Sequence, residues 1–423
     1  MDERVLLRDA DLHDPLREPG KNMMIWVYQG VTMLIGLLVV MGLALTVFSL
    51  FTARRHFLRG TRPPPLAAWP KISILKPVEG AGPETYQSFA SFCCLDYPGE
   101  MEIRIGTIHP GDPVVAMVRR LQQEFPDRDI RLVLASLQGA NRKTSIMEAL
   151  WRNASGQLLF FSDADVFAPP DYLRQLVPPL TSPGVGCLTC LPRGIQAGSL
   201  GGRMIALHYG FNYLPQWMLA LQTTGIQWAI GHTMAIPRPV LEQLNGFKNF
   251  PNHLADDYEL GNRIAKLGWR VVVPPVLMDC VMPAESLGDS FGRMRRWKRT
   301  IRRSRGHQFL GVIITYPVFW ALILALLHPL SGWSWGALGL VVAIRWLLAA
   351  SLQAAVKMPD WPRTWWLLPL VDVVEGLAFF GAYAGDSVCW AGRHYTLRRD
   401  GTLEPNALKT PLKASERFSA VEH

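Results

Sequence analysis

The stretch LLFFSDADVFAPPDYL, Leu158–Leu173, decides the fold prediction. Its apolar start, followed by acidic residues and two prolines, is typical of a buried β-strand that ends in a turn. Asp163 and Asp165 stand one residue apart at that strand end, where unpaired carboxylates are costly to bury. Hard oxygen ligands suit Mg²⁺ or Mn²⁺, so both acids are candidate metal ligands. The alternative is an aspartate that only caps the turn.

Three segments before this stretch repeat its design. They are KISILKPVEG from Lys71, MEIRIGTIHPGD from Met101 and DIRLVLASLQGANRK from Asp129, each a β-rich run that ends in polar or small residues. The segments between them have apolar residues at helical spacing, as in DPVVAMVRRLQQEF from Asp112. Strands that alternate with helices predict an α/β fold with a parallel sheet that is covered by helices on both sides.

The loops after these strands are the predicted ligand site, because parallel sheets bind ligands beyond the carboxyl ends of their strands. These loops carry Glu79, Asp112, Lys143 and the two acids of the opening stretch. The site has the character of a nucleotide pocket, but no GxGxxG follows a strand and no GxxxxGK[ST] occurs. A dinucleotide-binding fold and a P-loop NTPase are therefore not supported.

Apolar segments near both ends predict an integral membrane protein. The chain is 49% apolar and 18% charged, with a mean hydropathy of +0.13. Met23–Phe51 is uncharged and long enough to cross a hydrocarbon core about 30 Å thick. No small-residue cleavage site follows it, so we interpret it as an anchor and not as a removed signal peptide. Two to three further spans are predicted in Phe309–Leu330, Trp333–Val356 and the more acidic Trp365–Trp390.

The charge pattern predicts the orientation of the domain between these spans. The predicted segments are an N-terminal tail (1–22), a transmembrane anchor (23–51), a cytoplasmic domain (70–307), a C-terminal membrane region (309–390) and a polar tail (391–423). Arginine-rich flanks place the domain in the cytoplasm by the positive-inside rule. Arg393, Arg398 and Arg399 favour the same side, which conflicts with three C-terminal spans and leaves the span number open. The net charge of +9 gathers at these flanks and indicates lipid headgroups as partners, with no nucleic acid.

Two further motifs follow in the domain. Asp256 and Asp257, in HLADDYELGNRIAKLGWRV, precede a helix with an apolar stripe. Capping and the helix dipole favour one acid at a helix start, but two adjacent acids exceed that need. RMRRW places Arg293, Arg296 and Trp297 directly before the C-terminal membrane region. Any juxtamembrane helix is expected to carry such arginines, so this motif gains weight only in combination with the acid pairs.

Together these motifs resemble inverting family-A glycosyltransferases, and specifically the ceramide glucosyltransferase family. The resemblance covers about residues 71 to 305 and rests on Asp112 after a strand, Asp163 at a later strand end, Asp257 before a helix, and the RxxRW element. SILKPVEG, GANRK and CLDYP also look like family elements. One departure is Asp165, since animal ceramide enzymes often lack this second acid. The other is that no counterpart of their acceptor-region histidine can be placed.

The resemblance implies a fold, a reaction and a set of roles. The fold is a GT-A nucleotide-sugar-binding (Rossmann-like) domain, and the reaction moves one hexose from a UDP-sugar to a lipid hydroxyl with inversion at the anomeric carbon. The implied roles are general base for Asp257; nucleotide-sugar binding for Glu79, Asp112, Lys143 and Asp163; the pyrophosphate and acceptor side for Arg293, Arg296 and Trp297; and Mg²⁺ or Mn²⁺ binding for Asp163 and Asp165.

Several alternatives stay open on the sequence. SFCCLDYP, GANRK, LADDYELG and RWKRTIR look at least as similar to bacterial hopanoid-linked N-acetylglucosamine transferases of the same family. A processive polysaccharide synthase shares DxD and RxxRW but needs more long spans, and a receptor or transporter does not need acids gathered at one sheet edge. The aromatic-rich segment Gly201–Gly225 is either an interfacial segment for the lipid acceptor or an amphipathic helix packed on the sheet.

Overall fold

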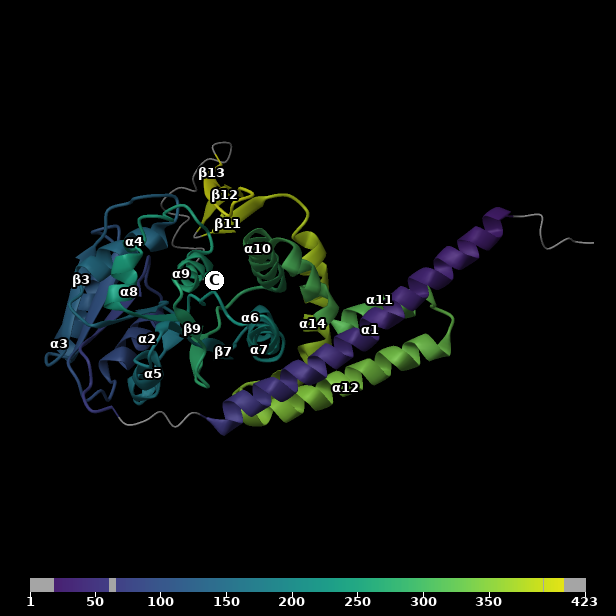
Figure 1. Cartoon of the computed structure of the whole chain (residues 1–423), viewed down its shortest axis with the longest axis horizontal. Coiled ribbons are helices and arrows are strands. Elements are labelled where there is room, and N and C mark those ends of the chain that lie inside the picture. Colours follow the sequence, from purple (N-terminus) through teal and green to yellow (C-terminus); the bar gives the residue numbers. More distant parts are fainter. Residues whose placement is uncertain (1–18, 61–65, 391, 407–423) are drawn as a thin grey trace, which may run out of the picture.

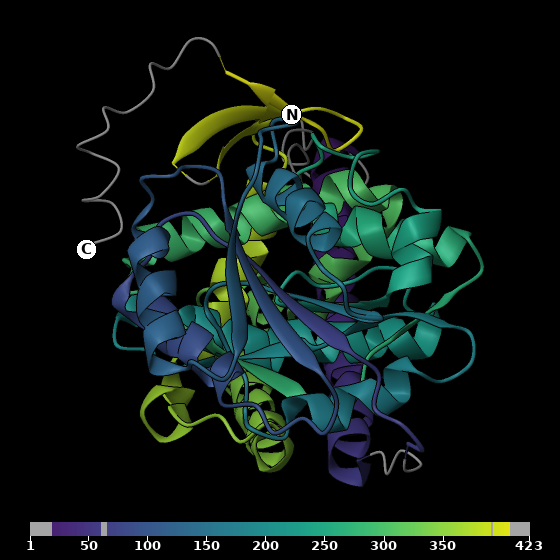
Figure 2. The ribbon, with the colours of Figure 1, turned by 90° about the vertical axis from the view of Figure 1, so that its left-hand side faces the viewer.

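A seven-stranded sheet forms the centre of the domain in the computed structural model, which describes residues 19–60, 66–390 and 392–406 (Figures 1 and 2). Its strand order is β3-β2-β1-β4-β8-β6-β9. The strands are β1 (Ile72–Pro77), β2 (Met101–Thr107), β3 (Asp129–Leu134), β4 (Leu158–Ser162), β6 (Val185–Thr189), β8 (Thr233–Pro237) and β9 (Arg270–Val272). The first four strands are parallel, as predicted. The sheet is nevertheless mixed, because β8 runs antiparallel to both β4 and β6.

Burial explains why the apolar runs pair in this way. Every residue of β1 and β4 is buried, since helices cover both faces of the sheet, and a two-sided core favours continuous apolar strands over alternating ones. The covering helices are α2 (Pro83–Cys93), α3 (Pro113–Glu124), α4 (Arg142–Arg152), α5 (Tyr172–Leu180), α8 (Arg238–Gln243) and α9 (Asp256–Lys266). At Gly106 of β2 a Cβ atom would lie 2.6 Å from Ile146 and 2.9 Å from Leu150. The glycine therefore lets α4, which carries the predicted site residue Lys143, pack closely on the sheet.

A second, three-stranded sheet connects the domain to its membrane side. It consists of β5 (Val166–Phe167), β10 (Leu277–Val281) and β7 (Leu191–Ile195). β5 directly follows the Asp163–Asp165 turn, and β10 leads to α10 (Leu287–Arg305), which carries the RxxRW motif. The short strand pair β5–β10 thereby brings these two distant parts of the sequence together.

The segment Gly201–Gly225 forms a broken helix between the sheets and the membrane helices. It comprises α6 (Leu200–His208), a π-helical turn (Tyr209–Tyr213) and α7 (Leu214–Thr223). α6 packs against α10, and α7 packs against α1 (Pro19–Arg59). π-helical turns are rare and often mark functional sites.

Three helices are long and apolar enough to cross a membrane within the described ranges: Asn22–Leu58, Gly332–Val356 (α12) and Trp361–Gly381, which ends in α14 (Leu368–Gly381). The first and α12 run side by side away from the domain (Figure 1). The first helix extends beyond the predicted anchor at both ends, whereas residues 1–18 of the predicted tail lie outside the described ranges.

The predicted span Phe309–Leu330 is not one continuous helix. A 3-10 segment, Gly306–Thr315, continues α10, and the combined helix Leu287–Thr315 is bent by 65° against α11, Pro317–Leu327. Tyr316 between them has non-helical backbone angles, and proline has no N–H to continue the preceding helix. A fourth candidate span exists only if this bent pair is counted as one.

The chain after α14 differs from the predicted polar tail. Ser387–Trp390 (β11), Arg393–Leu397 (β12) and Leu403–Pro405 (β13) form an antiparallel sheet, drawn in yellow at the top of Figure 2. Leu403 donates its backbone N–H to the Asn252 carbonyl at 2.7 Å, and Leu254 donates to the Gly401 carbonyl at 3.1 Å. An apolar cluster formed by Leu254, Val388, Tyr395, Leu397 and Leu403 closes this contact. Residues 392–405 therefore return to the α/β domain, while 391 and 407–423 lie outside the described ranges.

Candidate active site

Lys143 joins the two acidic motifs that the sequence predicted. It lies in the first turn of α4, whose start is capped by Asn141. Its ammonium is 2.5 Å from Asp163 Oδ1 and 3.8 Å from Asp256 Oδ2. Burial opposes the lysine's charge, but the carboxylates of Asp163, Asp256 and Asp257 outweigh it and raise the pKa of Lys143. The Asp163–Asp165 turn (the predicted donor motif) and the Asp256–Asp257 pair (the predicted base motif) thus lie at one site.

The turn after β4 presents the predicted metal ligands. Asp163 pairs with Lys143, while Asp165 stays accessible to solvent. Surrounding protein atoms and the like charge of Asp163 raise the pKa of Asp165. Within the described ranges, no three or more His, Cys, Asp and Glu side chains are grouped to hold a metal ion. Mg²⁺ commonly takes one or two carboxylates plus substrate phosphates, so this pair fits a cation that arrives with a nucleotide.

The second acidic pair begins α9, but neither acid caps it. The capping position is Ala255, which makes no side-chain cap bond. Asp256 is 5% exposed, and its Oδ1 accepts only a long hydrogen bond, 3.5 Å, from the Asn141 amide. Asp257 is more accessible, and it accepts backbone N–H bonds from Gly231 at 2.9 Å and Tyr258 at 2.7 Å. Burial and the neighbouring Asp256 raise the pKa of Asp257 to about 6, a value suited to a base that works near neutral pH.

Sequence reasoning missed Gly231 and His232, which lie between the two acidic motifs. A Cβ atom on Gly231 would be 3.0 Å from Lys143 Nζ, 3.4 Å from Asp163 Oδ2 and 3.5 Å from Asp257 Oδ2. The His232 backbone carbonyl accepts from the Asp163 N–H at 3.4 Å. Both residues directly precede the antiparallel strand β8, and no motif marks them. The β8 pairing that brings them here connects positions more than 60 residues apart, as in Ser162 with Thr233.

The loops after β1 and β2 form a second group at the same sheet edge. Asp112 caps α3 by accepting from the Val114 N–H at 2.9 Å, and its other oxygen accepts from the Gly80 N–H at 2.9 Å. Glu79 accepts hydrogen bonds from the Arg142 guanidinium at 2.7 and 2.6 Å. Asp112 and Glu79 therefore already hold these loops together. Arg142, which was not among the predicted site residues, binds Glu79 and directly precedes Lys143 in the chain.

The RxxRW motif lies on α10 with its three residues in different surroundings. Arg293 pairs with Glu285 at 2.7 Å. Arg296 has no carboxylate within 4 Å among the residues that the structure describes. Trp297 stacks on His208 and on Tyr209, with ring centroids 5.5 and 5.7 Å apart.

Tyr209 connects this motif to the acidic turn. Its hydroxyl lies 3.2 Å from His232 Nε2, and the His232 carbonyl in turn binds the Asp163 N–H. Trp297, Tyr209, His232 and Asp163 form a continuous path from α10 to β4. The π-helical turn, which holds Tyr209, is thus part of the site.

The buried acid Glu375, from the predicted C-terminal membrane region, stabilises two neighbours of Trp297. Glu375 of α14 is fully buried and lies 2.5 Å from Lys298 Nζ, 2.8 Å from His208 Nδ1 and 2.9 Å from the Tyr316 hydroxyl. Buried charges are stable only when they are paired. Glu375 holds the residue after Trp297 and the histidine that stacks on it, which explains one of the two acids in this largely apolar helix.

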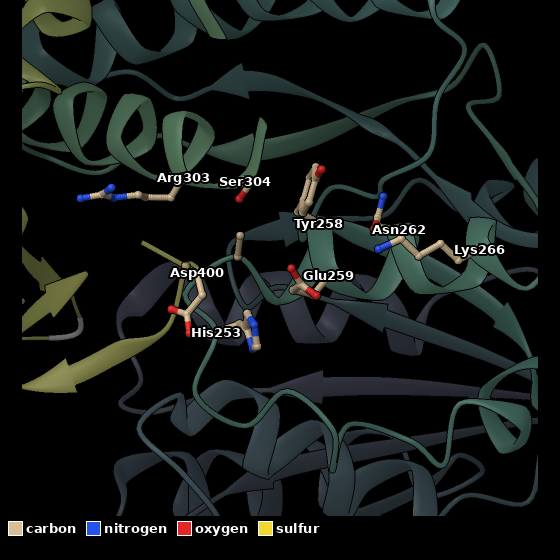
Figure 3. Close-up of a pocket in the computed structure, with 10 residues that line it drawn as sticks. His253, Tyr258, Glu259, Asn262, Lys266, Arg303, Ser304 and Asp400 are labelled. Atoms are coloured by element: carbon tan, nitrogen blue, oxygen red, sulfur yellow. The ribbon is translucent and has the colours of Figure 1, made fainter. Parts of the chain in front are cut away.

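A separate cavity of about 240 Å³ lies on another face of α9. Figure 3 shows its side chains from α9, from the end of α10 and from the turn between β12 and β13. It is lined by His253, Ala255, Tyr258, Glu259, Asn262, Lys266, Arg303, Ser304, Asp400 and Gly401. Asp256 and Asp257 do not line it, so the C-terminal sheet borders the base motif without covering it.

Comparisons with known proteins show the family to which the chain belongs. Residues 34–403 match the family model described as glycosyl transferase family 21. Ceramide glucosyltransferase 1 of Caenorhabditis elegans is 20% identical over 83% of this chain and 77% of its own length. Beta-monoglucosyldiacylglycerol synthase of Synechocystis is 25% identical over 69% of this chain and 58% of its own length. A solved mannosyltransferase from Pyrobaculum calidifontis aligns with 81% of this chain and 99% of its own, with 19% identity and a TM-score of 0.46.

The fold, the site and the apolar helices define a membrane glycosyltransferase. More specifically, the chain belongs to glycosyl transferase family 21, and the predicted resemblance to the ceramide glucosyltransferase family is confirmed.

Proposed function

We propose that this protein is an inverting glycosyltransferase that moves one hexose from a UDP-sugar to the hydroxyl of a membrane lipid. The observation that carries the proposal is the position of Lys143, 2.5 Å from Asp163 of the donor motif and 3.8 Å from Asp256 of the base motif. A single displacement needs its leaving group and its base at one site. The proximity of α7 to the membrane helix α1 supports a lipid as the acceptor.

The donor would lie against the edge formed by the loops after β1, β2 and β4. Glu79 and Asp112 hold two of these loops and would shape the uridine and ribose pocket. Lys143 would face the pyrophosphate together with Arg296, which has no carboxylate within 4 Å in the described part of the chain. The charge of the pyrophosphate grows as the sugar leaves and must be stabilised at that moment. Arg293 is bound to Glu285, so we assign it the task of holding α10, with Trp297 beside the acceptor.

Asp257 would act as the general base. Its two backbone N–H bonds fix the carboxylate, and its raised pKa gives it the proton affinity for the task. It would take the proton of the lipid hydroxyl while that oxygen attacks the anomeric carbon from the side opposite UDP. One such displacement converts an α-linked donor into a β-linked product. Asp163 and Asp165 would hold Mg²⁺ or Mn²⁺, which when bound neutralises charge on the leaving diphosphate.

The relatives support two donor sugars. The ceramide relative is a glucosyltransferase by name and the diacylglycerol relative is a monoglucosyldiacylglycerol synthase, which favours UDP-glucose. An N-acetylglucosaminyltransferase of Bradyrhizobium diazoefficiens is 25% identical over 55% of this chain, which keeps UDP-N-acetylglucosamine as the second candidate. The chain spans 49% of that relative's length. With either sugar, the acceptor would be a ceramide, hopanoid or diacylglycerol hydroxyl.

Transfer should depend on both the lipid and a divalent cation. We expect purified protein in nanodiscs with UDP-glucose or UDP-N-acetylglucosamine and membrane lipid extract to yield a lipid that carries one sugar, detected by mass spectrometry. EDTA should lower the rate at least tenfold, and Mg²⁺ or Mn²⁺ should restore it, because Asp163 and Asp165 alone repel the diphosphate. A polymeric product would favour the polysaccharide synthase, and full activity after exhaustive chelation would remove the cation from the proposal.

We also propose that the domain and the C-terminal sheet share the cytoplasmic face. The sheet binds Asn252 and Leu254 of the domain, so the chain between them must cross the membrane an even number of times. α12 would supply one of these two crossings, and the bent pair that ends in α11, which packs against α12, would supply the other. α14 packs on α10 and would stay at the domain side of the membrane. The basic flanks favour the cytoplasm for this side.

Reporter fusions test this topology. Green fluorescent protein fused after His423 should fluoresce, because that end would be cytoplasmic. Alkaline phosphatase, which is active only outside the cytoplasm, should be active when inserted between α11 and α12 near Leu330 and inactive when fused after His423. Active phosphatase at both positions would contradict the shared face, and activity at neither would mean that α11 and α12 do not cross.

A further inference from the structure

Lys76 is a fully buried lysine directly beneath the Asp163–Asp165 turn. It is the second-last residue of β1, and its side chain is 0% exposed. Its ammonium donates to the Asp163 backbone carbonyl at 2.6 Å and to the Ser162 hydroxyl at 3.3 Å. Among the residues that the structure describes, no carboxylate lies within 4 Å of it. The lysine therefore binds the backbone of the turn and not one of its carboxylates.

Two aromatic rings line the other side of this ammonium. It lies 4.0 Å from the ring centroid of Phe92 and 5.0 Å from that of Phe89. Such contacts recover less free energy than the burial of an ion costs. Burial lowers the pKa of Lys76 to about 7, although Asp165 and Asp163 act in the opposite direction. A hydrophobic side chain of the same length would be cheaper for stability alone, so the ammonium needs another explanation.

The position of the turn provides that explanation. Asp163 and Asp165 carry like charges with one residue between them, and in a continued strand their side chains would lie side by side on the same face. The chain instead leaves β4 after Ser162 and turns at Ala164 and Asp165, so the backbone of this turn sets how the two carboxylates can approach one ligand. The Asp163 carbonyl is the atom that starts this turn, since it also accepts from the Val166 N–H at 3.5 Å. A charged donor on that carbonyl fixes the turn and offsets part of the repulsion between the two acids.

We propose that Lys76 is a positioning residue that holds the Asp163–Asp165 turn in the conformation that binds a divalent cation together with the nucleoside diphosphate. This inference rests on the proposed function. Lys76 touches neither ligand, and it acts through the backbone of Asp163.

The K76M variant tests the proposal, because methionine keeps the length and apolar volume and removes only the ammonium. We expect K76M to fold with an unchanged or higher Tm, since replacing a buried charge with an apolar side chain is often stabilising. The dissociation constant of Mn²⁺·UDP, measured by calorimetry on the full-length protein, should rise about 10- to 100-fold, as expected for one lost hydrogen bond to a charged group. The KM for the UDP-sugar should rise more than kcat falls.

R104M is the matched control. Arg104 is a buried cation of the neighbouring strand β2 that pairs with Glu102, away from the turn. R104M should lower Tm and leave the Mn²⁺·UDP affinity within about twofold of wild type. If K76M behaves like R104M, Lys76 is only a structural residue and the proposal is wrong.

Two further outcomes separate the possible failures. Should K76M not fold, S162A removes the weaker partner of the same ammonium and should still weaken Mn²⁺·UDP binding by about two- to fivefold; unchanged binding overturns the proposal. If wild-type protein itself binds no Mn²⁺·UDP, the proposed function fails, and the positioning role fails with it. If wild type binds it and K76M binds it equally well, only the positioning role fails.

Discussion

Replacing Asp257 with asparagine is expected to abolish measurable sugar transfer while UDP-sugar binding stays within about threefold of wild type. Asparagine keeps the shape and can still accept the Gly231 N–H bond, but it cannot take a proton. A positioned general base contributes about 10²–10⁴-fold to a rate, which is about 3–5 kcal/mol of barrier. The measurement is single-turnover transfer to lipid beside calorimetric binding of the donor.

The pH dependence of the wild-type enzyme should report the same group. Because the base must be deprotonated, and its pKa is raised to about 6, kcat/KM should fall as the pH drops through about 6. Above that pH the limb should be flat until another group titrates. A flat profile from pH 5 to 8 would contradict the assignment of Asp257 as the base.

D256N is the control for D257N. Asp256 is nearly fully buried, and its charge raises the pKa of Asp257. D256N should therefore keep most of the activity and move the acid limb to lower pH. An inactive D256N beside an active D257N would make Asp256 the base, and normal transfer by both variants would leave this pair as a helix start only.

The four parallel strands could be predicted because each is a β-rich run that ends in polar or small residues, and β1 and β4, which are buried throughout, are the most apolar of them. A strand buried on both faces leaves that pattern in the local sequence. The antiparallel β8 leaves a weaker trace, since its five residues, TMAIP, resemble any short apolar run. Gly231 and His232 were missed for the same reason, because only the pairing of β8 with β4 brings them to Asp163.

Lys76 and the C-terminal sheet show what else a single sequence conceals. In KISILKPVEG, Lys76 looks like the polar end of a strand, and its burial depends on Phe89 and Phe92 of a different element. Ser387–Trp390 looks like the end of an apolar span, but its strand partners are the residues that were predicted as a tail. Tertiary contacts of this kind have no periodicity that a local reading can detect.

Removing the charge of Lys143 should have the second largest effect. In K143M the carboxylates of Asp163, Asp256 and Asp257 lose the cation that they share. Removing one partner of a buried ion pair costs about 3–5 kcal/mol, and the 22% exposure of Lys143 favours the lower end. We expect transfer at pH 7 to fall about 100-fold, since 1.4 kcal/mol corresponds to a factor of ten.

The pH dependence of the lost activity distinguishes an electrostatic effect of Lys143 on Asp257 from a direct contact of Lys143 with the donor. Without the cation the pKa of Asp257 should rise above its wild-type value, so more of the base is protonated at pH 7 and the acid limb of kcat/KM moves to higher pH. Part of the activity should then return at pH 8.5. A uniform loss at every pH would mean that Lys143 acts only on the diphosphate and does not influence the base.

A double variant and a surface lysine complete this test. D256N removes one of the two like charges that K143M leaves beside Asp257, so D256N/K143M should move the acid limb back toward wild type. This non-additivity is expected only for residues in one charge network. K266M, at an exposed lysine on another face of α9, should leave both the rate and the acid limb unchanged. If K266M moves the acid limb by the same amount, the effect comes from the net charge of the domain. The proposal that Lys143 couples Asp163 to Asp257 would then be contradicted.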